Sequence, residues 1–196
     1  MDIFSHGLWA GAIAKGINNK NGRLSYWKTF CWGIFPDVFA FAIPFIVLFW
    51  GLITGNAAFS QFRSPEDGGP ATDIDSGITG LAHSLYNFSH SLVIFLFVIG
   101  LFYVAHRFFL PTRFKLRRLP WEMLGWPLHI LSDIPTHTYK FFPTPFLYPF
   151  FSTKINGYAW AHPLFLAIDY GLLILVYAYL WRKSLFKRNL KNSPKL

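Results

Sequence analysis

The residues of this sequence that are best able to do chemistry are histidines and aspartates within or beside apolar segments. His129 and Asp133 stand four residues apart in His129-Ile-Leu-Ser-Asp133, so in a helix both side chains project from one face and can hold one ion. Thr136 and His137 follow directly. An imidazole and a carboxylate are costly in apolar surroundings. A bound ion would explain them, and so would a hydrogen bond between the two side chains inside a helical bundle.

Three further positions place a polar group at the edge of an apolar segment: His6 after Phe4-Ser5, Asp37 after Pro36, and His90 within Asn87-Phe-Ser-His-Ser91. Each position alone is typical of a hydrogen-bonded core or interface residue. Histidine and aspartate nevertheless recur at the boundary of every apolar segment, and together they provide nitrogen and oxygen donors for one or two divalent metal ions. We therefore predict a metal centre formed by His6, Asp37, His90, His129 and Asp133.

Other polar residues are further candidates for the same site. His137 lies four residues after Asp133, but Pro135 interrupts the helix between them. His162 and Asp169 lie seven residues apart on one face of the last apolar helix, where they would either reach the site or make structural hydrogen bonds. The only cysteine is Cys31, which excludes intrachain disulfides and thiolate zinc sites.

Apolar helices must position these residues. The chain has 196 residues, of which 53% are hydrophobic and 14% charged, whereas a soluble domain has about 25% charged residues. Long apolar runs cover residues 38–54, 92–110, 121–134 and 159–181. The second and the fourth reach the roughly 20 residues that cross a bilayer. The third is shorter and contains Glu122, His129 and Asp133, which predicts a helix buried among the others.

Shorter segments complete the predicted architecture. Residues 3–17 predict a short apolar helix, and residues 26–35 predict another that Pro36-Asp37 separates from the following run, because proline marks a helix start or a kink. We expect an all-α, polytopic membrane bundle with about four long apolar helices and some half-spanning ones. It would form a single domain over residues 1–196, with a polar loop at 57–80 and a basic cytoplasmic tail at 182–196.

The net charge of +9 favours a membrane over a nucleic acid as partner. The basic residues cluster beside apolar runs, as cytoplasmic anchors do, and the alternation of basic and acidic segments favours both termini on the cytoplasmic side. Nucleic-acid binding needs a solvated basic face with stacking aromatics, but the aromatic residues here lie inside the apolar runs. The N-terminus lacks the basic region of a signal peptide, so we expect its first residues to belong to the mature fold.

Short polar elements follow one another in a fixed order within residues 1–150: Asp2 with Ser5-His6, Pro36-Asp37, His83 with His90-Ser91, and Gly125 with His129, Asp133 and Thr136, followed by Pro145-Phe146. In the order of these elements the chain resembles the bacterial inner-membrane metal-dependent hydrolase family. Its ligand pattern is similar to those of zinc-dependent phospholipases C and single-strand zinc nucleases. Ser84 and Phe39 stand where many members have an arginine and a second aspartate.

The resemblance implies a metal-dependent hydrolase of the bacterial inner membrane that cleaves a phosphoester or an ester. The position of the site at the membrane predicts an amphiphilic substrate, such as a lipid or a lipid-linked ester. One or two divalent ions, most simply zinc, would be held by the five predicted ligands, with His83 as a further candidate. Asp37 would accept a proton from the attacking water. The rival hypotheses are an ion or proton transport protein, and an assembly protein whose His/Asp core is only hydrogen-bonded.

Overall fold

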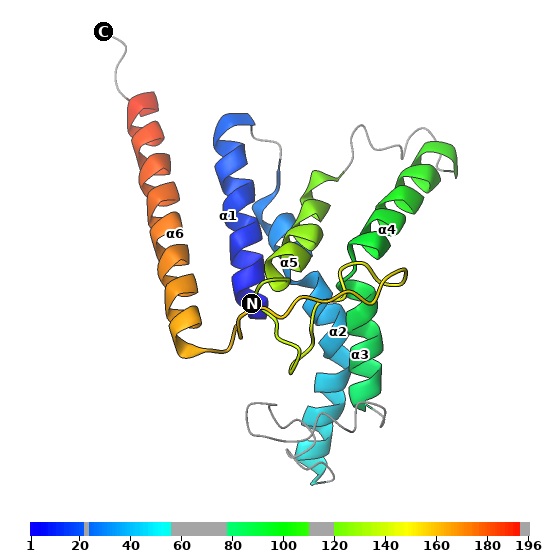
Figure 1. Ribbon diagram of the computed structural model, residues 1–196. Helices are drawn as coiled ribbons and strands as arrows, with labels where there is room; N and C mark the ends of the chain where they lie inside the picture. Colours follow the sequence, from blue (N-terminus) through cyan, green and yellow to red (C-terminus); the bar gives the residue numbers. More distant parts are fainter. Residues whose placement is uncertain (22–23, 56–77, 110–119, 193–196) are drawn as a thin grey trace.

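The computed structural model describes residues 1–21, 24–55, 78–109 and 120–192, and helices dominate these ranges (Figure 1). Across the described ranges no strand forms, and one antiparallel bridge pairs Thr138 with Phe141. The predicted all-α class is confirmed. Short turns of π-helix and 3-10 helix lie at Ala105–Phe109 and Trp121–Leu124. The α-helices are α1 (Ile3–Asn21), α2 (Tyr26–Thr54), α3 (Ile78–Ser89), α4 (Leu92–Val104), α5 (Gly125–Asp133) and α6 (Pro163–Asn192).

Two helices are each long and apolar enough to cross a membrane, α2 over its whole length and α6 over Pro163–Phe186. Within the residues that the structure describes, a third crossing exists only if α3 and α4, which meet at a bend of 62°, count as one span. The described part of the chain therefore has two or three candidate spans, fewer than the predicted number of about four long apolar helices. The run at residues 121–134 forms only the 3-10 turn and the nine-residue α5, because the residue before Pro135 is disfavoured in a continuing helix.

Helix α2 is longer than predicted, because it continues through Pro36 and Pro44. Each proline removes one backbone donor, yet neither ends the helix, and both rings are fully buried. Asp37 therefore lies inside α2 and does not start a new helix. The N-terminus of α2 is capped by Ser25, and its C-terminus by Gly55 in the left-handed conformation (φ 72°), which glycine adopts without steric cost.

Two other predicted segments differ in extent. The polar loop at 57–80 lies largely outside the described residues, and its end already belongs to α3, which begins at Ile78. In the basic tail, α6 continues as far as Asn192. At its other end α6 starts at Pro163, later than the apolar run at 159–181, because a proline in the first helical turn loses no hydrogen bond.

Helices α1, α2 and α5 approach one another through glycines. A Cβ atom added to Gly33 would lie 2.8 Å from the Cβ of Ala10 and 2.9 Å from the carbonyl oxygen of His6. A Cβ atom added to Gly125 would lie 2.5 Å from the carbonyl oxygen of Thr29 and 2.8 Å from the amide nitrogen of Gly33. Small residues of this kind let helix backbones meet closely, so α1 and α5 both contact α2 just before Asp37.

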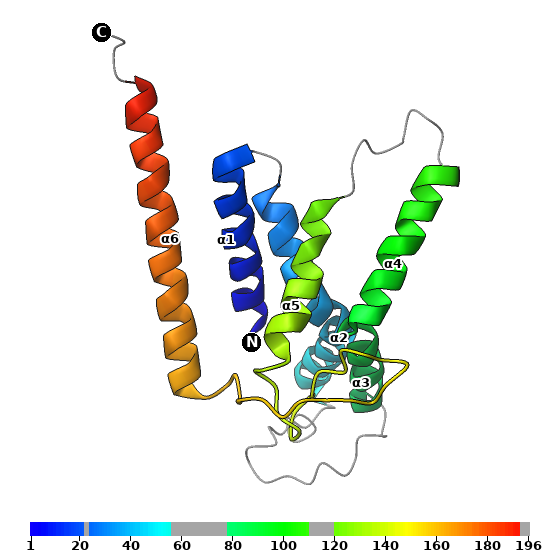
Figure 2. The same cartoon turned by 45° about the horizontal axis from the view of Figure 1, so that its top comes forward.

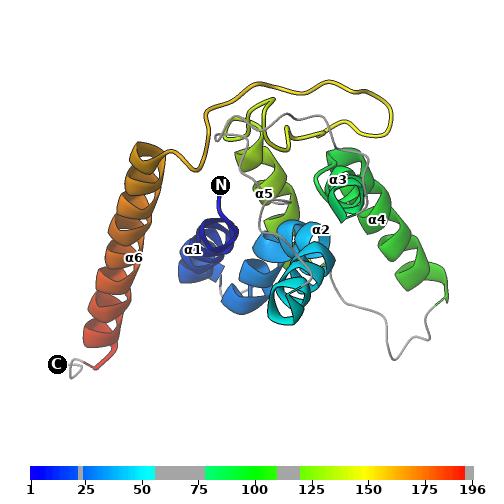
Figure 3. The same cartoon turned by 90° about the horizontal axis from the view of Figure 1, so that it is seen from below.

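An apolar cluster fixes the opposite side of α5. Its buried members are Phe95, Met123, Trp126 and Ile130, and the indole of Trp126 donates a hydrogen bond to the carbonyl oxygen of Ser89 (2.6 Å). This bond ties α5 to the junction between α3 and α4. Figures 2 and 3 show α6 at the edge of the bundle beside α1, far from α4.

Candidate metal centre

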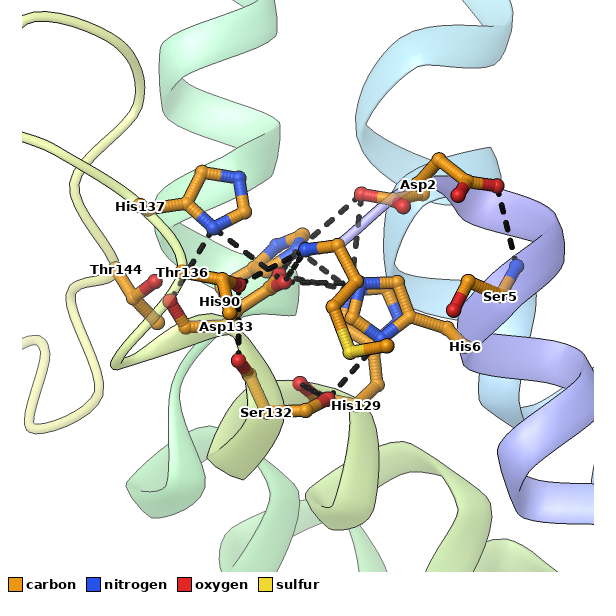
Figure 4. A network of polar contacts seen from close by, with 12 residues as sticks. Asp2, Ser5, His6, His90, His129, Ser132, Asp133, Thr136, His137 and Thr144 are labelled. Atoms are coloured by element: carbon orange, nitrogen blue, oxygen red, sulfur yellow. Dashed lines mark hydrogen bonds and ion pairs between the residues drawn. The ribbon is translucent and has the colours of Figure 1, made fainter. Parts of the chain in front are cut away.

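The five residues predicted as ligands come together from four parts of the fold. His6 lies in the first turn of α1, Asp37 lies within α2, and His129 and Asp133 lie on α5. His90 lies at the break between α3 and α4, which exists because the Ser91 hydroxyl caps α4 by accepting a hydrogen bond from the N–H of Ile94 (3.2 Å). All five are buried, and Figure 4 shows the histidine rings around the carboxylate of Asp133.

Four of these residues could hold one metal ion. One ligand atom from each of Asp37, His90, His129 and Asp133 lies within 4.8 Å of the others. The two Nε2 atoms of His90 and His129 are 3.0 Å apart. Asp133 Oδ2 lies 3.4 Å from the Nε2 of His90 and 3.1 Å from that of His129, and Asp37 Oδ1 lies 3.4 Å and 3.6 Å from the same two atoms.

Hydrogen bonds on the far side of both rings show which nitrogen carries the proton. His129 Nδ1 lies 2.6 Å from the carbonyl oxygen of Gly33, and His90 Nδ1 lies 3.2 Å from that of Tyr86. A carbonyl oxygen only accepts, so Nδ1 is the protonated nitrogen in each neutral ring. The two Nε2 atoms then present lone pairs to each other and to the two carboxylates, as imidazole ligands oriented by backbone carbonyls do.

His6 also carries its proton on Nδ1 and directs Nε2 at a carboxylate. Its Nδ1 lies 3.1 Å from the hydroxyl oxygen of Ser132, and that hydroxyl already donates to the backbone oxygens of Leu128 and His129. The Ser132 oxygen therefore accepts the proton of His6 Nδ1, which leaves a lone pair on Nε2 directed at Asp133 Oδ1, 2.9 Å away. The ring of His6 also stacks on that of His129, with centroids 3.6 Å apart.

Two polar atoms of the cluster have no hydrogen-bond partner in the described part of the chain. His6 Nε2 and Asp133 Oδ2 are fully buried and make no hydrogen bond with the described residues. Burying unpaired polar atoms next to two carboxylates is costly, and a cation among the Nε2 and carboxylate atoms removes this cost. Imidazole and carboxylate donors suit zinc and related divalent ions, so the residues present fit a metal ion.

Two further groups also face Asp133: the N-terminal amine, which sequence reasoning did not place at the centre, and His137, which it named as an additional candidate. The N-terminal amine of Met1 lies 2.8 Å from Asp133 Oδ1 and 3.0 Å from the hydroxyl oxygen of Thr136. His137 Nδ1 lies 3.3 Å from Asp133 Oδ1, although the same nitrogen also lies 3.2 Å from the backbone oxygen of Asp133. Asp133 is thus the residue that all parts of the cluster share.

Burial changes the acid–base behaviour of the outer histidines. Desolvation lowers the pKa of His6 to about 4, with a further contribution from His129. Desolvation also lowers the pKa of His137 to about 4. Burial alone would raise the pKa of Asp133, but its amine and imidazole neighbours outweigh burial and hold that pKa well below its usual value. Near neutral pH these shifts favour uncharged rings at His6 and His137 and a charged carboxylate at Asp133, the forms in which such groups bind metals.

The pKa values of His6 and His137 predict how acid affects the metal-free protein. The unfolded chain takes up protons near a histidine pKa of 6.5, whereas the folded chain takes them up only near pH 4. The unfolded state therefore binds more protons between these values, so the free energy of unfolding decreases as the pH falls from about 6.5 to about 4. Melting temperatures of detergent-purified, metal-free protein at pH 7.5, 6 and 5 should fall in that order, and the slope should be shallower in His137→Gln. Equal melting temperatures would contradict the assignment.

Two of the weaker candidates lie away from the cluster. His83 is half-buried on α3, and its ring stacks on Phe142 with centroids 4.2 Å apart. His162 is exposed, and its Nδ1 accepts a hydrogen bond from the N–H of Leu164 (3.2 Å) in the first turn of α6. Of the two roles predicted for His162, the structure shows the structural one.

Asp169 joins α6 to the start of α1. Its carboxylate accepts hydrogen bonds from the hydroxyl of Ser5 and from the indole N–H of Trp9 (2.8 Å). Next to it, Tyr170 donates to Asp2 (3.0 Å), whose carboxylate also accepts from the first N–H groups of α1. Because Ser5 precedes His6, Asp169 holds the turn that places His6, and it has a positioning role rather than a ligand role.

Asp169→Ala should therefore weaken metal binding without removing a ligand. We expect the metal affinity, measured by competition with a chelator, to fall by about tenfold, as it does when a residue supporting a ligand is lost. Asp169→Asn retains an acceptor oxygen for Trp9 and should recover most of the affinity. If alanine has no effect, or if asparagine is as damaging as alanine, the positioning role is wrong.

Sequence reasoning missed the groups behind the imidazoles. The carbonyl oxygens of Gly33 and Tyr86 come from the backbone, so side-chain identity does not reveal them. Ser132 lies one residue before Asp133 and could have been considered, because a serine one turn from a predicted ligand is a common hydrogen-bond partner.

Comparison with known proteins identifies no further site residue, because no family model, no curated protein and no solved structure matches the chain.

Proposed function

We propose that this protein is an integral membrane hydrolase that depends on a divalent metal, most simply zinc, bound by His90, His129 and Asp133, with Asp37 and His6 beside them. The observation that carries the proposal is the set of Nε2 lone pairs directed at two buried carboxylates. Because these rings carry their proton on Nδ1, their Nε2 lone pairs and the carboxylate oxygens cannot satisfy one another, whereas a cation satisfies both. A divalent ion supplies Lewis-acid chemistry and makes water acidic enough to act as a nucleophile near neutral pH.

The two aspartates suit different tasks. The side chain of Asp133 is fully buried and faces four imidazoles, which suits a ligand, whereas that of Asp37 is 10% exposed and faces two. The nearest Nε2 atom lies 3.4 Å from Asp37 Oδ1 and 2.9 Å from Asp133 Oδ1, so Asp37 is the less closely held carboxylate and can accept a proton from water while Asp133 remains engaged. General-base catalysis needs a carboxylate within reach of both solvent and the centre, and Asp37 meets both conditions.

The surroundings of the centre favour a lipid or lipid-linked phosphoester or ester as substrate. The helices around the centre expose many large apolar side chains, for example Ile53 (80%) on α2 and Ile174 (68%) on α6. Such surfaces are rare on soluble monomers and suit the hydrocarbon of a bilayer. The order of the site elements in the sequence, which resembles that of bacterial inner-membrane hydrolases, supports location in that membrane.

The test is to measure bound metal and hydrolysis on the same detergent-purified protein. We expect about one or two ions per chain and metal-dependent cleavage of a phospholipid or a lipid phosphodiester. Asp37→Asn should keep most of the metal and lose most of the hydrolysis. A metal content below about one ion per ten chains would contradict the proposal, because structural ions survive mild purification. Metal binding with ion flux in liposomes and no hydrolysis would instead favour a transport protein.

A further inference from the structure

The helices around the centre have a basic end and a His/Asp end. In α1, His6 lies in the first turn, and Lys15 lies farther along. In α4, His90 lies just before the first residue, and Arg107 follows the last. Helix α5 runs the other way: it ends at Asp133, and the sequence at residues 113–118, before its first turn, contains four basic residues.

Helix α6 has the same polarity. Asp169 lies near its start and contacts Ser5 beside the centre, whereas Arg182 and Lys183 lie toward its far end. Figures 1 and 2 both show the ends of α1, α4 and α6 and the start of α5 on one side of the molecule, with the N-terminus and the centre well away from that side. In the described part of the chain four elements, α1, α4, α6 and the start of α2 with Lys28, therefore agree on which end of the bundle is basic.

Most lysines and arginines of the sequence fall in segments that include or adjoin these helix ends. Residues 15–28, 107–118 and 182–196 contain all but three of the 18 lysines and arginines. The exceptions are Arg63, Lys140 and Lys154. Lysine and arginine next to membrane spans are retained on the cytoplasmic side, so the basic end is the cytoplasmic end.

Helix α6 gives the depth of the centre. From Pro163 to Arg182 it rises about 30 Å at about 1.5 Å per residue, which is about the thickness of the hydrocarbon core. Pro163 therefore lies at the boundary opposite the basic end. Asp169 lies about 10 Å inside that boundary on the same scale. Because Asp169 bonds Ser5, the centre is closer to the non-cytoplasmic boundary than to the cytoplasmic one.

The segment between α5 and α6 marks the same boundary. Residues 134–162 are mostly irregular and run across one side of the bundle (Figure 3), and irregular backbone is not tolerated in contact with lipid hydrocarbon. Exposed aromatic side chains of the kind found at membrane interfaces include Tyr139, Phe150 and Tyr158. The backbone N–H groups of Thr136 and His137 donate to the carbonyl oxygen of Asp133 (both 3.0 Å) and hold this segment against the end of α5.

We propose that the His/Asp centre opens to the non-cytoplasmic side of the membrane, beneath the interfacial segment 134–162. The orientation follows from charge and helix polarity alone. Its consequence for the substrate rests on the proposed function: the hydrolase acts on a lipid or lipid-linked phosphoester held in the outer leaflet of that membrane.

Two matched Ser→Cys variants test the orientation. Cys31→Ala removes the only cysteine, and Ser152→Cys or Ser184→Cys is then added at exposed positions in the interfacial segment or near the basic end of α6. Intact bacterial cells that express each full-length variant are treated with a membrane-impermeant maleimide. Detergent-permeabilised cells provide the level of complete labelling. We expect Ser152→Cys to be labelled almost completely in intact cells, and Ser184→Cys to be labelled only after permeabilisation.

The outcomes separate the orientation from the function. Labelling of Ser184→Cys in intact cells, or protection of Ser152→Cys until permeabilisation, would overturn the orientation whatever the metal content. The expected labelling in a protein that binds no metal would leave the orientation standing and overturn the hydrolase. Hydrolysis of a lipid supplied only to the outer leaflet of oriented proteoliposomes, with none when it is supplied to the inner leaflet, would support both.

Discussion

Asp133→Asn should abolish metal binding and leave the protein folded. Asp133 is the residue that the whole cluster shares: Oδ2 faces His90 and His129, and Oδ1 faces His6. Asparagine keeps the shape of the side chain but removes the negative charge. A neutral amide cannot replace a carboxylate ligand, so we expect the affinity for zinc to fall by at least about 100-fold, more than for loss of a supporting residue.

The measurement is metal content after dialysis, combined with circular dichroism to follow the helices. Glu122→Gln is the matched control, because this carboxylate accepts a hydrogen bond from the N–H of Ser25 (3.2 Å) and is absent from the four-residue metal group. It should keep the wild-type metal content. If Asp133→Asn also keeps it, the cluster is only a hydrogen-bonded core, and the rival structural hypothesis stands.

Gly33→Ala should destabilise both the bundle and the centre. The new methyl would lie 2.8 Å from the Cβ of Ala10 and 2.9 Å from the carbonyl oxygen of His6, so α1 would have to move away from α2. Overpacking of this kind costs about 1–3 kcal/mol. The carbonyl oxygen of Gly33 also accepts a hydrogen bond from His129 Nδ1 (2.6 Å), so His6 and His129 would shift together.

We expect a lower melting temperature and a lower metal affinity for Gly33→Ala. Gly100→Ala on α4 is the control, because nothing lies within 4 Å of the added methyl and alanine stabilises a helix by about 0.5–1 kcal/mol relative to glycine. The prediction would be wrong if Gly33→Ala melted at the wild-type temperature, or if it lost stability while binding metal normally.

The sequence was informative where spacing within one helix determines geometry. His129 and Asp133 lie four residues apart, and the structure has them on one face of α5 with 3.1 Å between Nε2 and Oδ2. The start of α1 near Ile3 was likewise predictable from its apolar pattern. The close α1–α2 crossing was also predictable, because Gly7 and Gly11 lie four residues apart, a spacing found where helices pack through glycine.

The remainder depended on long-range contacts that spacing does not reveal. Pro36 was expected to break a helix, yet α2 continues through it, because the fold buries the ring at a tight helix junction. His83 and His90 belong to one sequence element, but only His90 lies at the α3–α4 bend that faces α5. Asp169 was placed on the correct helix, although its partners, Ser5 and Trp9, are more than 150 residues away.

The interfacial segment has a consequence for the energetics of metal binding. Besides its bonds to the end of α5, it accepts hydrogen bonds from the N–H of Leu92 (3.0 Å, at Phe146) and from the Ser91 hydroxyl. It therefore links the element that carries Asp133 to the element that carries His90. With both elements already held, the binding of a metal ion would spend little free energy on ordering the chain, and we expect the bundle to stay assembled when such an ion is removed.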